Sequence, residues 1–390
     1  MLSVQSTPAN NDGARRRQSK RDEAIRKKFE SELMKKSRSR SRRDQPAAAI
    51  PHHMRVPGTV GALRPTQALT VREAMSVVEA SQLMAAKRAD CVLVVDGNEH
   101  LAGIFTAKDL AFRVVADNLE ARSVLVRDIM TRNPFCVTAD TAATEALNTM
   151  VQRHFRHLPV CNDEGDVVGL LDITRCMYEA LDKMERAYGS SRKLYEAVEG
   201  VEREWASRQP AALLQFVEAL RDKMSCPDLT SILDNQTEVA EIGVKATVRE
   251  AAQLMKTYGT TAVLVMEGDG RIGGIFTSKD IVLRVIAAGL SPDKCSVIRV
   301  MTPHPDVAPP NLTLLQALRK MHDGHYLNLP VVDGDDVLGM VDVLKLTYHA
   351  LEQINSIEGT GDSENPVWSR FFNFGADDSM SEISESQVTS

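Results

Sequence analysis

Hydrophobic and polar residues follow one another along this chain in a pattern that predicts helices and short strands in regular succession. In residues 78–84 the apolar positions follow the period of about 3.6 residues that is typical of an amphipathic helix. The runs 92–95 and 101–105 are largely apolar and are joined by a polar turn, which predicts two buried strands. A second helix is expected from Asp109 onward. The predicted unit is therefore helix, strand, turn, strand, helix.

This unit belongs to an internal repeat that covers most of the chain. Segments of the first half recur in the second half at one constant offset, nearly letter for letter. Each half is itself double, because the spacing from Gly103 to Gly169 is almost the same as that from Gly274 to Gly339. The recurrences are Gln82-Leu83-Met84 as Gln253-Leu254-Met255, Gly103-Ile104-Phe105-Thr106 as Gly274-Ile275-Phe276-Thr277, Lys108-Asp109 as Lys279-Asp280, Met130-Thr131 as Met301-Thr302, and Leu158-Pro159-Val160 as Leu329-Pro330-Val331.

The repeats divide the chain into four α/β units with flanking segments. A short sheet covered by helices cannot bury both of its faces alone, so we expect the units to pair. Between the second and third units, Leu194, Val198, Val201 and Trp205 lie on one helical stripe and indicate a helical spacer. The expected boundaries are a basic Ser/Arg-rich disordered tail at 1–60, units at 66–122, 126–184, 236–292 and 297–352, the spacer at 185–230, and an acidic Ser-rich disordered tail at 353–390.

Charge is distributed unevenly along the chain. Residues 1–50 hold 14 Lys and Arg against 6 Asp and Glu, whereas the rest of the chain holds 33 against 47. This balance argues against a broad nucleic-acid surface and leaves only a weak contact through the basic N-terminal tail. Ser19-x-x-Asp22 is suited to cap a short helix there, with Ile25, Phe29 and Leu33 on one face. A solvated tail, a nuclear-import signal and a contact with an anionic surface all remain open.

Several classes of protein are disfavoured by what the sequence lacks. No stretch approaches the roughly 20 apolar residues that span a bilayer, and no signal-peptide segment is seen, so we expect a cytoplasmic or nuclear protein. The six cysteines include no CxxC pair and are expected to be buried free thiols. His154-x-x-His157 and His322-x-x-His325 have metal-like spacing but no third ligand nearby. Neither a metal nor enzyme activity is predicted.

At this point the chain resembles the cystathionine-β-synthase (CBS) domain family, with four copies that form two tandem Bateman modules. The resemblance covers residues 66–352. It is carried by Asp128-Ile129-Met130-Thr131 and Arg299-Val300-Met301-Thr302 at unit starts, by the Leu-Pro-Val strand entries, and by Gly-Ile-Phe-Thr-x-Lys-Asp. The chain is also similar to fungal and plant proteins in which a Phox-and-Bem-type domain follows four such units. We expect that domain to be absent, because only about 38 residues follow the fourth unit.

The resemblance implies that paired units bind adenine nucleotides or related ligands in their clefts. In the family, the Thr and Asp of the motif Gly-h-h-Thr-x-x-Asp, where h is a hydrophobic residue, hold the ribose hydroxyls. The residues at these positions in unit one are Thr106 and Asp109. Thr277 and Asp280 are their counterparts in unit three. A strand end at a helix N-terminus also favours anionic ligands.

Units two and four depart from this motif. Asp172 and Asp342 stand at the Thr position, and Arg175 and Lys345 stand at the Asp position. A cation cannot accept a hydrogen bond from a ribose hydroxyl, so two competent sites and two altered ones are expected. Arg175 and Lys345 could instead touch phosphates.

A reading without any ligand explains the same residue types. Thr-x-x-Asp at a helix start is close to a capping box, which stabilises the helix by itself. The candidate phosphate contacts can likewise be ordinary surface charges or i,i+4 ion pairs. Those candidates are Lys108, Arg113, Lys279, Arg284, Arg156 and His157.

We therefore expect a regulatory protein that needs no cofactor and uses an adenine nucleotide, such as AMP, ADP or ATP, as a regulatory ligand. Its modules are expected to pair within the chain or in a homodimer, and to relay ligand occupancy to an unidentified protein partner. The alternatives are a ligand-free scaffold or dimerisation protein, and a regulatory subunit of an enzyme on another chain.

Overall fold

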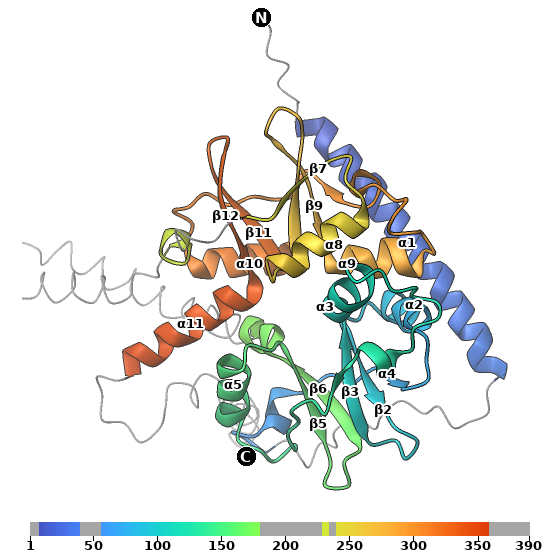
Figure 1. Ribbon diagram of the computed structural model, residues 1–390. Helices are drawn as coiled ribbons and strands as arrows, with labels where there is room; N and C mark the ends of the chain where they lie inside the picture. Colours follow the sequence, from blue (N-terminus) through green and yellow to red (C-terminus); the bar gives the residue numbers. More distant parts are fainter. Residues whose placement is uncertain (1–7, 40–55, 180–227, 234–238, 359–390) are drawn as a thin grey trace, which may run out of the picture.

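The computed structural model describes residues 8–39, 56–179, 228–233 and 239–358. Units one and two lie together in the lower half of the view and units three and four in the upper half (Figure 1). The predicted spacer and acidic tail lie outside the described residues, apart from 228–230 and 353–358.

Unit one forms largely as its hydrophobic pattern predicts. Its elements are β1 (Thr70–Arg72), α2 (Val77–Lys87), β2 (Cys91–Val95), β3 (Leu101–Thr106), α3 (Ala107–Asp109), η3 (Leu110–Val115), α4 (Val126–Ile129) and β4 (Thr131–Arg132). The sheet order is β1-β2-β3-β4, with β1 parallel to β2 and the other pairs antiparallel. β2 is buried at every position, as an apolar run without alternation requires. Ser76 and Glu79 form the capping box that begins α2.

Unit three repeats this arrangement. Its elements are β7 (Glu241–Gly243), α8 (Val248–Thr257), β8 (Ala262–Met266), β9 (Ile272–Thr277), α9 (Ser278–Asp280), η5 (Ile281–Ala287), η6 (Val297–Arg299) and β10 (Thr302–Pro303). The sheet order is β10-β9-β8-β7 with the same parallel and antiparallel pairs. A Cβ at Gly103 would overlap the side chain of Met130, and one at Gly274 would overlap Met301. This packing explains why glycine and methionine recur together in the two units.

Units two and four are smaller in their strand content. Unit two has α5 (Ala143–Gln152), β5 (His157–Cys161) and β6 (Val167–Asp172), and unit four has α10 (Leu314–Gly324), β11 (Asn328–Asp333), β12 (Asp336–Asp342) and α11 (Val343–Glu358). In each, two strands pair antiparallel. Isolated bridges Thr66↔Leu170 and His100↔Asp166 join unit one to unit two. These bridges make the two units one module.

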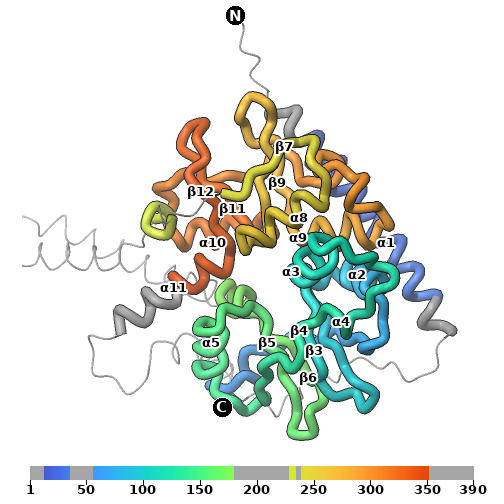
Figure 2. Tube along the Cα trace, viewed as in Figure 1, coloured from blue at the N-terminus to red at the C-terminus, as the bar shows by residue number. Residues whose placement is uncertain are grey.

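The two modules pack odd unit on odd unit and even unit on even unit. One apolar cluster combines Met84 and Phe105 of unit one with Met255 and Phe276 of unit three. A second cluster combines α5 with α10, and Figure 2 shows the four units gathered around a common centre. The modules therefore pair within one chain, as expected. A homodimer remains a prediction.

The N-terminal segment differs from the expectation of a disordered tail. Residues Pro8–Ser39 form one continuous helix, α1, so Ser19 and Asp22 lie inside it and do not cap its start. Phe29 is 4% exposed and packs against α2 and η5. Composition favoured disorder, but burial of an apolar position against two units supplies the stabilisation that the basic sequence lacks. Residues 1–7 and 40–55 lie outside the described part.

The cysteines match the prediction only in part. Four of them are buried free thiols: Cys91, Cys161, Cys176 and Cys295. Burial raises the pKa of Cys161 to about 12, which keeps that thiol protonated. Cys136 is exposed, contrary to the expectation, and Cys226 lies outside the described residues.

Candidate functional site

A cavity of about 990 Å³ lies where the four units and α1 meet. Its walls bring together all ten residues that the sequence nominated as site residues. Among the described residues that line it, nine are Lys or Arg and six are Asp. The basic residues are Arg15, Arg26, Arg88, Lys108, Arg113, Arg156, Lys279, Arg284 and Lys345, and the acidic ones are Asp22, Asp90, Asp109, Asp280, Asp306 and Asp342. The cavity is thus net basic, although the chain beyond residue 50 is net acidic.

In unit one, Thr106 and Asp109 bind each other. Thr106 ends β3 and is the N-cap of α3. Its backbone N–H and its hydroxyl donate to Asp109 Oδ2 at 2.9 and 2.7 Å, and Asp109 N–H donates to Thr106 Oγ1 at 3.3 Å. Arg113 Nη1 lies 3.2 Å from Asp109 Oδ1. A carboxylate offers about four acceptor positions. The two contacts from Thr106 and the one from Arg113 occupy three of them, which leaves roughly one on Asp109 Oδ1.

Unit three has the same geometry. The backbone N–H and hydroxyl of Thr277 donate to Asp280 Oδ2 at 2.8 and 2.9 Å. Arg284 Nη1 lies 2.9 Å from Asp280 Oδ1. Burial raises the pKa of Asp280 and of Asp109 above the ordinary value, and the hydrogen bonds and arginines oppose that rise. Both pairs therefore form the capping boxes that the ligand-free reading predicted.

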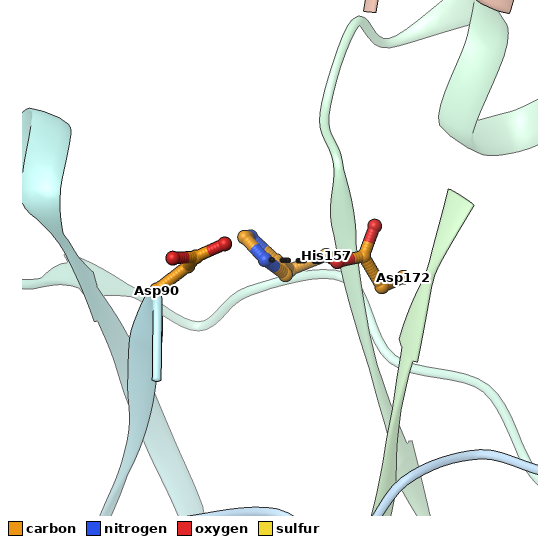
Figure 3. A group of neighbouring side chains, drawn as sticks. All are labelled: Asp90, His157 and Asp172. Carbon is orange, nitrogen blue, oxygen red and sulfur yellow. Dashed lines mark ion pairs between the residues drawn. The ribbon is translucent and has the colours of Figure 1, made fainter. Parts of the chain in front are cut away.

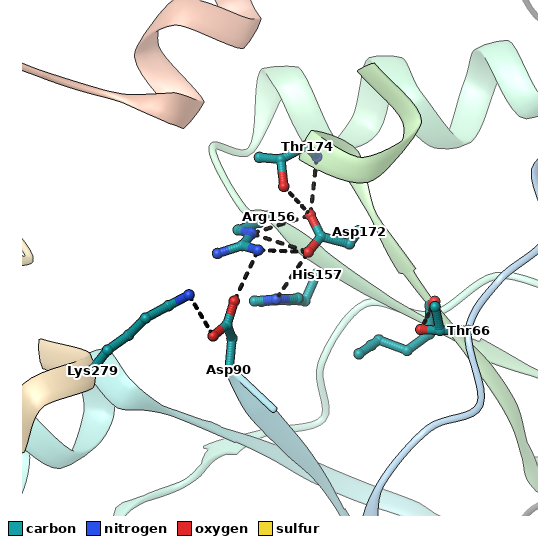
Figure 4. A network of polar contacts seen from close by, with 8 residues as sticks. Thr66, Asp90, Arg156, His157, Asp172, Thr174 and Lys279 are labelled. Carbon is teal, nitrogen blue, oxygen red and sulfur yellow. Dashed lines mark hydrogen bonds and ion pairs between the residues drawn. The ribbon is translucent and has the colours of Figure 1, made fainter. Parts of the chain in front are cut away.

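A second polar network connects unit two with both odd units (Figure 4). Arg156 binds Asp172 through Nε at 3.1 Å and Nη2 at 2.7 Å, and its Nη2 also lies 2.9 Å from Asp90 Oδ2. Lys279 Nζ of unit three lies 2.7 Å from Asp90 Oδ1. Burial alone would raise the pKa of Asp90, but Lys279 and Arg156 lower it overall. Arg156 and Lys279, two of the candidate phosphate contacts, are thus paired with carboxylates in this structure.

His157 lies between Asp90 and Asp172 (Figure 3). One atom from each of these three side chains falls within 4.8 Å of the others, which is close enough for a metal ion. The two carboxylates, however, already bind the guanidinium of Arg156, and a cation would have to compete with it. Burial first, and then Arg156, lower the pKa of His157 to about 4, so the ring is neutral at pH 7.

The aspartates of the even units act as helix caps. Asp172 Oδ1 accepts from Thr174 N–H at 3.0 Å, and Asp342 Oδ1 accepts from Leu344 N–H and Lys345 N–H at 2.8 and 2.9 Å. Arg175 pairs with Glu179 at 2.8 Å and does not line the cavity. Asp172 and Asp342 therefore cap helices of their own units, whereas Lys345, unlike Arg175, lines the cavity.

Some site residues escaped the sequence reading. Asp90 and Asp22 were not nominated, yet both line the cavity and bind cations there. In the other module, Thr261 stands at the position that corresponds to Asp90, and Leu327 stands at the position that corresponds to Arg156. Differences between the repeats were the available signal for this network.

The comparisons with known proteins place the chain in a family. The family model for the CBS domain matches residues 60–116, 126–182, 234–287 and 297–350. The chain belongs to the CBS domain family. Each of these four ranges lies on one of the units described above and contains one antiparallel pair of strands.

Similar proteins are found in fungi and plants. The "Meiotically up-regulated gene 70 protein" of Schizosaccharomyces pombe is 41% identical over 396 residues, which cover 94% of this chain and 53% of that protein. The "CBS domain-containing protein CBSCBSPB3" of Arabidopsis thaliana is 41% identical over 316 residues, or 80% of this chain and 56% of that one. This CBS chain thus spans about half the length of the curated relatives it matches.

A solved structure shares the fold. A Methanocaldococcus jannaschii protein, described as an archaeal homolog of g-AMPK, superimposes with a TM-score of 0.52 at 17% identity, over 73% of this chain and 96% of that one.

In the described part of this CBS chain, none of the helices combines the length and apolar character needed to cross a membrane.

Proposed function

We propose that this CBS protein binds an adenosine-type nucleotide, such as AMP, ADP or ATP, in its central cavity and relays occupancy to a protein partner. The excess of Lys and Arg over Asp in that cavity carries the proposal. Cations gathered in a partly enclosed, low-dielectric space attract an anion more strongly than the same charges in water.

The ribose would be held at the odd units. Asp109 Oδ1 keeps roughly one acceptor position, and Asp280 Oδ1 keeps one in the same geometry. The hydroxyls of Thr106 and Thr277 can rotate away from their aspartates and donate to a ligand instead. A carboxylate that accepts from both hydroxyls of a cis-diol fixes orientation as well as affinity.

The phosphate would meet arginine. Arg113 uses Nη1 for Asp109 and for the carbonyl of Ile129, at 3.2 and 2.8 Å. Its Nε and Nη2 have no partner among the described residues, and its side chain is 46% exposed. That edge of the guanidinium matches the spacing of two phosphate oxygens. Arg156 is less available, because Asp90 and Asp172 neutralise it.

Isothermal titration of the full chain with AMP and with adenosine tests this proposal. AMP should bind, and Asp109→Ala together with Asp280→Ala should abolish binding while circular dichroism is unchanged. The matched control is Asp128→Ala. Asp128 also accepts at a helix start, from Leu125 N–H at 3.2 Å, but lies outside the cavity. Unchanged affinity in the double variant would remove the ribose role.

A ligand-free scaffold is the second candidate function. It is favoured by the mutual hydrogen bonds of Thr106 with Asp109 and of Thr277 with Asp280, which satisfy both pairs without a ligand. A ligand at 100 times its dissociation constant adds about 2.7 kcal/mol of stability. No thermal shift with AMP, ADP, ATP or S-adenosylmethionine would favour the scaffold, whereas co-purification of an enzyme would identify the partner class.

A further inference from the structure

The equivalent arginines of the two odd units differ in what they bind. Arg284 directs Nη1 to Asp280 and to the carbonyl of Val300, just as Arg113 directs its Nη1 in unit one. Its other edge holds a carboxylate from α1: Nε and Nη2 donate to Asp22 at 2.9 and 2.7 Å. The side chain of Arg284 is 8% exposed, against 46% for Arg113. Since the two arginines occupy the same position of the repeat, unit one is an internal reference for unit three.

Helix α1 places Asp22 there through a small apolar cluster and several polar contacts. Phe29 is its buried apolar anchor, between Ala85 of α2 and Leu283 of η5. Gln18 Nε2 donates to Asp22 Oδ1 at 3.1 Å and orients it. Two ion pairs to other elements lie at the rim: Arg15 with Asp306 at 2.8 Å, and Glu23 with Arg88 at 2.9 Å. In Figure 1, α1 runs along the outer edge of the odd units.

Two anions cannot use the same edge of one guanidinium. A carboxylate and a phosphate both bind that edge through two parallel hydrogen bonds, and like charges at this distance repel. We propose that α1 is an internal competitor, such that docking of Asp22 and binding of a phosphate-bearing ligand at Arg284 exclude each other. This inference rests on the proposed function of the cavity.

The competition makes the two odd sites unequal. At unit one the phosphate meets a guanidinium edge of Arg113 that holds no other side chain, whereas at unit three Asp22 must first leave Arg284. By linkage, α1 weakens the ligand at unit three by the same factor by which the ligand weakens docking of α1. Release of α1 would expose Asp22, Phe29 and a helix that contains the basic run Arg15-Arg16-Arg17. Ligand binding at unit three would thereby change which residues are exposed on the outer surface.

Hydrogen exchange and calorimetry on the full chain test this competition, with AMP and adenosine as probes. AMP should bind in two classes of site and should speed hydrogen exchange in α1 at least about tenfold. Adenosine has no phosphate and should not speed exchange in α1. Asp22→Asn should tighten the weaker AMP site at least about tenfold, which is about 1.4 kcal/mol. Phe29→Ala, which loosens α1 but keeps Asp22, should tighten it too. Glu23→Gln removes only the exposed pairs with Arg88 and Lys27 and should change both quantities far less than Asp22→Asn or Phe29→Ala.

The outcomes separate the two proposals. AMP binding at two sites with unchanged α1 exchange and no effect of Asp22→Asn would overturn the competition and leave the proposed function intact. Binding at one site in the natural chain and at two in Asp22→Asn would support the competition in its strongest form. Absence of AMP binding in both the natural chain and Asp22→Asn would overturn both.

Discussion

The largely buried ion-pair network around Arg156 allows a quantitative prediction about stability. Arg156 is the cation shared by Asp90 and Asp172, and the side chains of the three residues are 15%, 22% and 19% exposed. Arg156→Leu copies Leu327 of the other module, leaves Asp172 without its arginine and leaves Asp90 with Lys279 as its remaining cation. Breaking a buried pair costs about 3–5 kcal/mol, and the residual exposure places this case near the lower end, at about 3 kcal/mol.

A second variant tests whether the loss comes from the stranded carboxylates. Asp90→Thr copies Thr261, so the double variant with Arg156→Leu leaves only Asp172, which still caps its helix as Asp342 does. The double variant should recover at least about 1 kcal/mol relative to Arg156→Leu alone.

The assay is urea unfolding of the full chain, followed by circular dichroism. The control is Lys279→Met, which removes a partner of Asp90 whose side chain is 43% exposed and should cost less than about 1 kcal/mol. If Arg156→Leu were as stable as the natural chain to within about 0.5 kcal/mol, the network would not be the buried and coupled group described here.

Two further predictions concern pH and close packing. Because burial holds the pKa of His157 at about 4, below its ordinary 6.5, the unfolded chain binds a proton there that the folded chain does not. Stability should therefore fall as pH falls from about 6.5 to about 4. In His157→Asn the urea midpoint should depend less on pH over that window. A pH dependence equal to that of the natural chain would count against this role of His157. Gly274→Ala should cost about 1–3 kcal/mol in urea unfolding, more than Gly103→Ala, since its Cβ would also lie 2.9 Å from the backbone oxygen of Thr302. In a Met130→Ala background, Gly103→Ala should cost little further stability, whereas in a Met301→Ala background Gly274→Ala should still cost stability, and equal costs in the two backgrounds would contradict this packing.

The repeat pattern was enough to predict the four units and their internal pairing. Period and turn signals act locally, so β2 and β3 could be assigned from residues 92–105. The position of Asp22 could not, because its partner Arg284 lies 262 residues away and nothing in the local sequence of α1 indicates that contact. The basic composition of residues 1–50 even favoured disorder, because composition does not record the burial of one phenylalanine.

The candidate site was predictable in its residue types and less so in their pairing. Thr106 and Asp109 were nominated for a ligand and also for a capping box, and the structure shows the capping box. Arg156 was nominated for phosphate, but its partner Asp90 belongs to the preceding unit and differs from the Thr261 of the repeat. Charge pairing across units depends on the assembled fold, which the sequence of one unit does not contain.

A crystal structure of the full chain grown with millimolar AMP tests the central claim most directly. The account predicts a ribose within hydrogen-bond distance of Asp109, a phosphate on the Nε and Nη2 edge of Arg113, and the hydroxyl of Thr106 turned toward the ligand. A cavity without nucleotide, in which Thr106 still donates to Asp109, would contradict it.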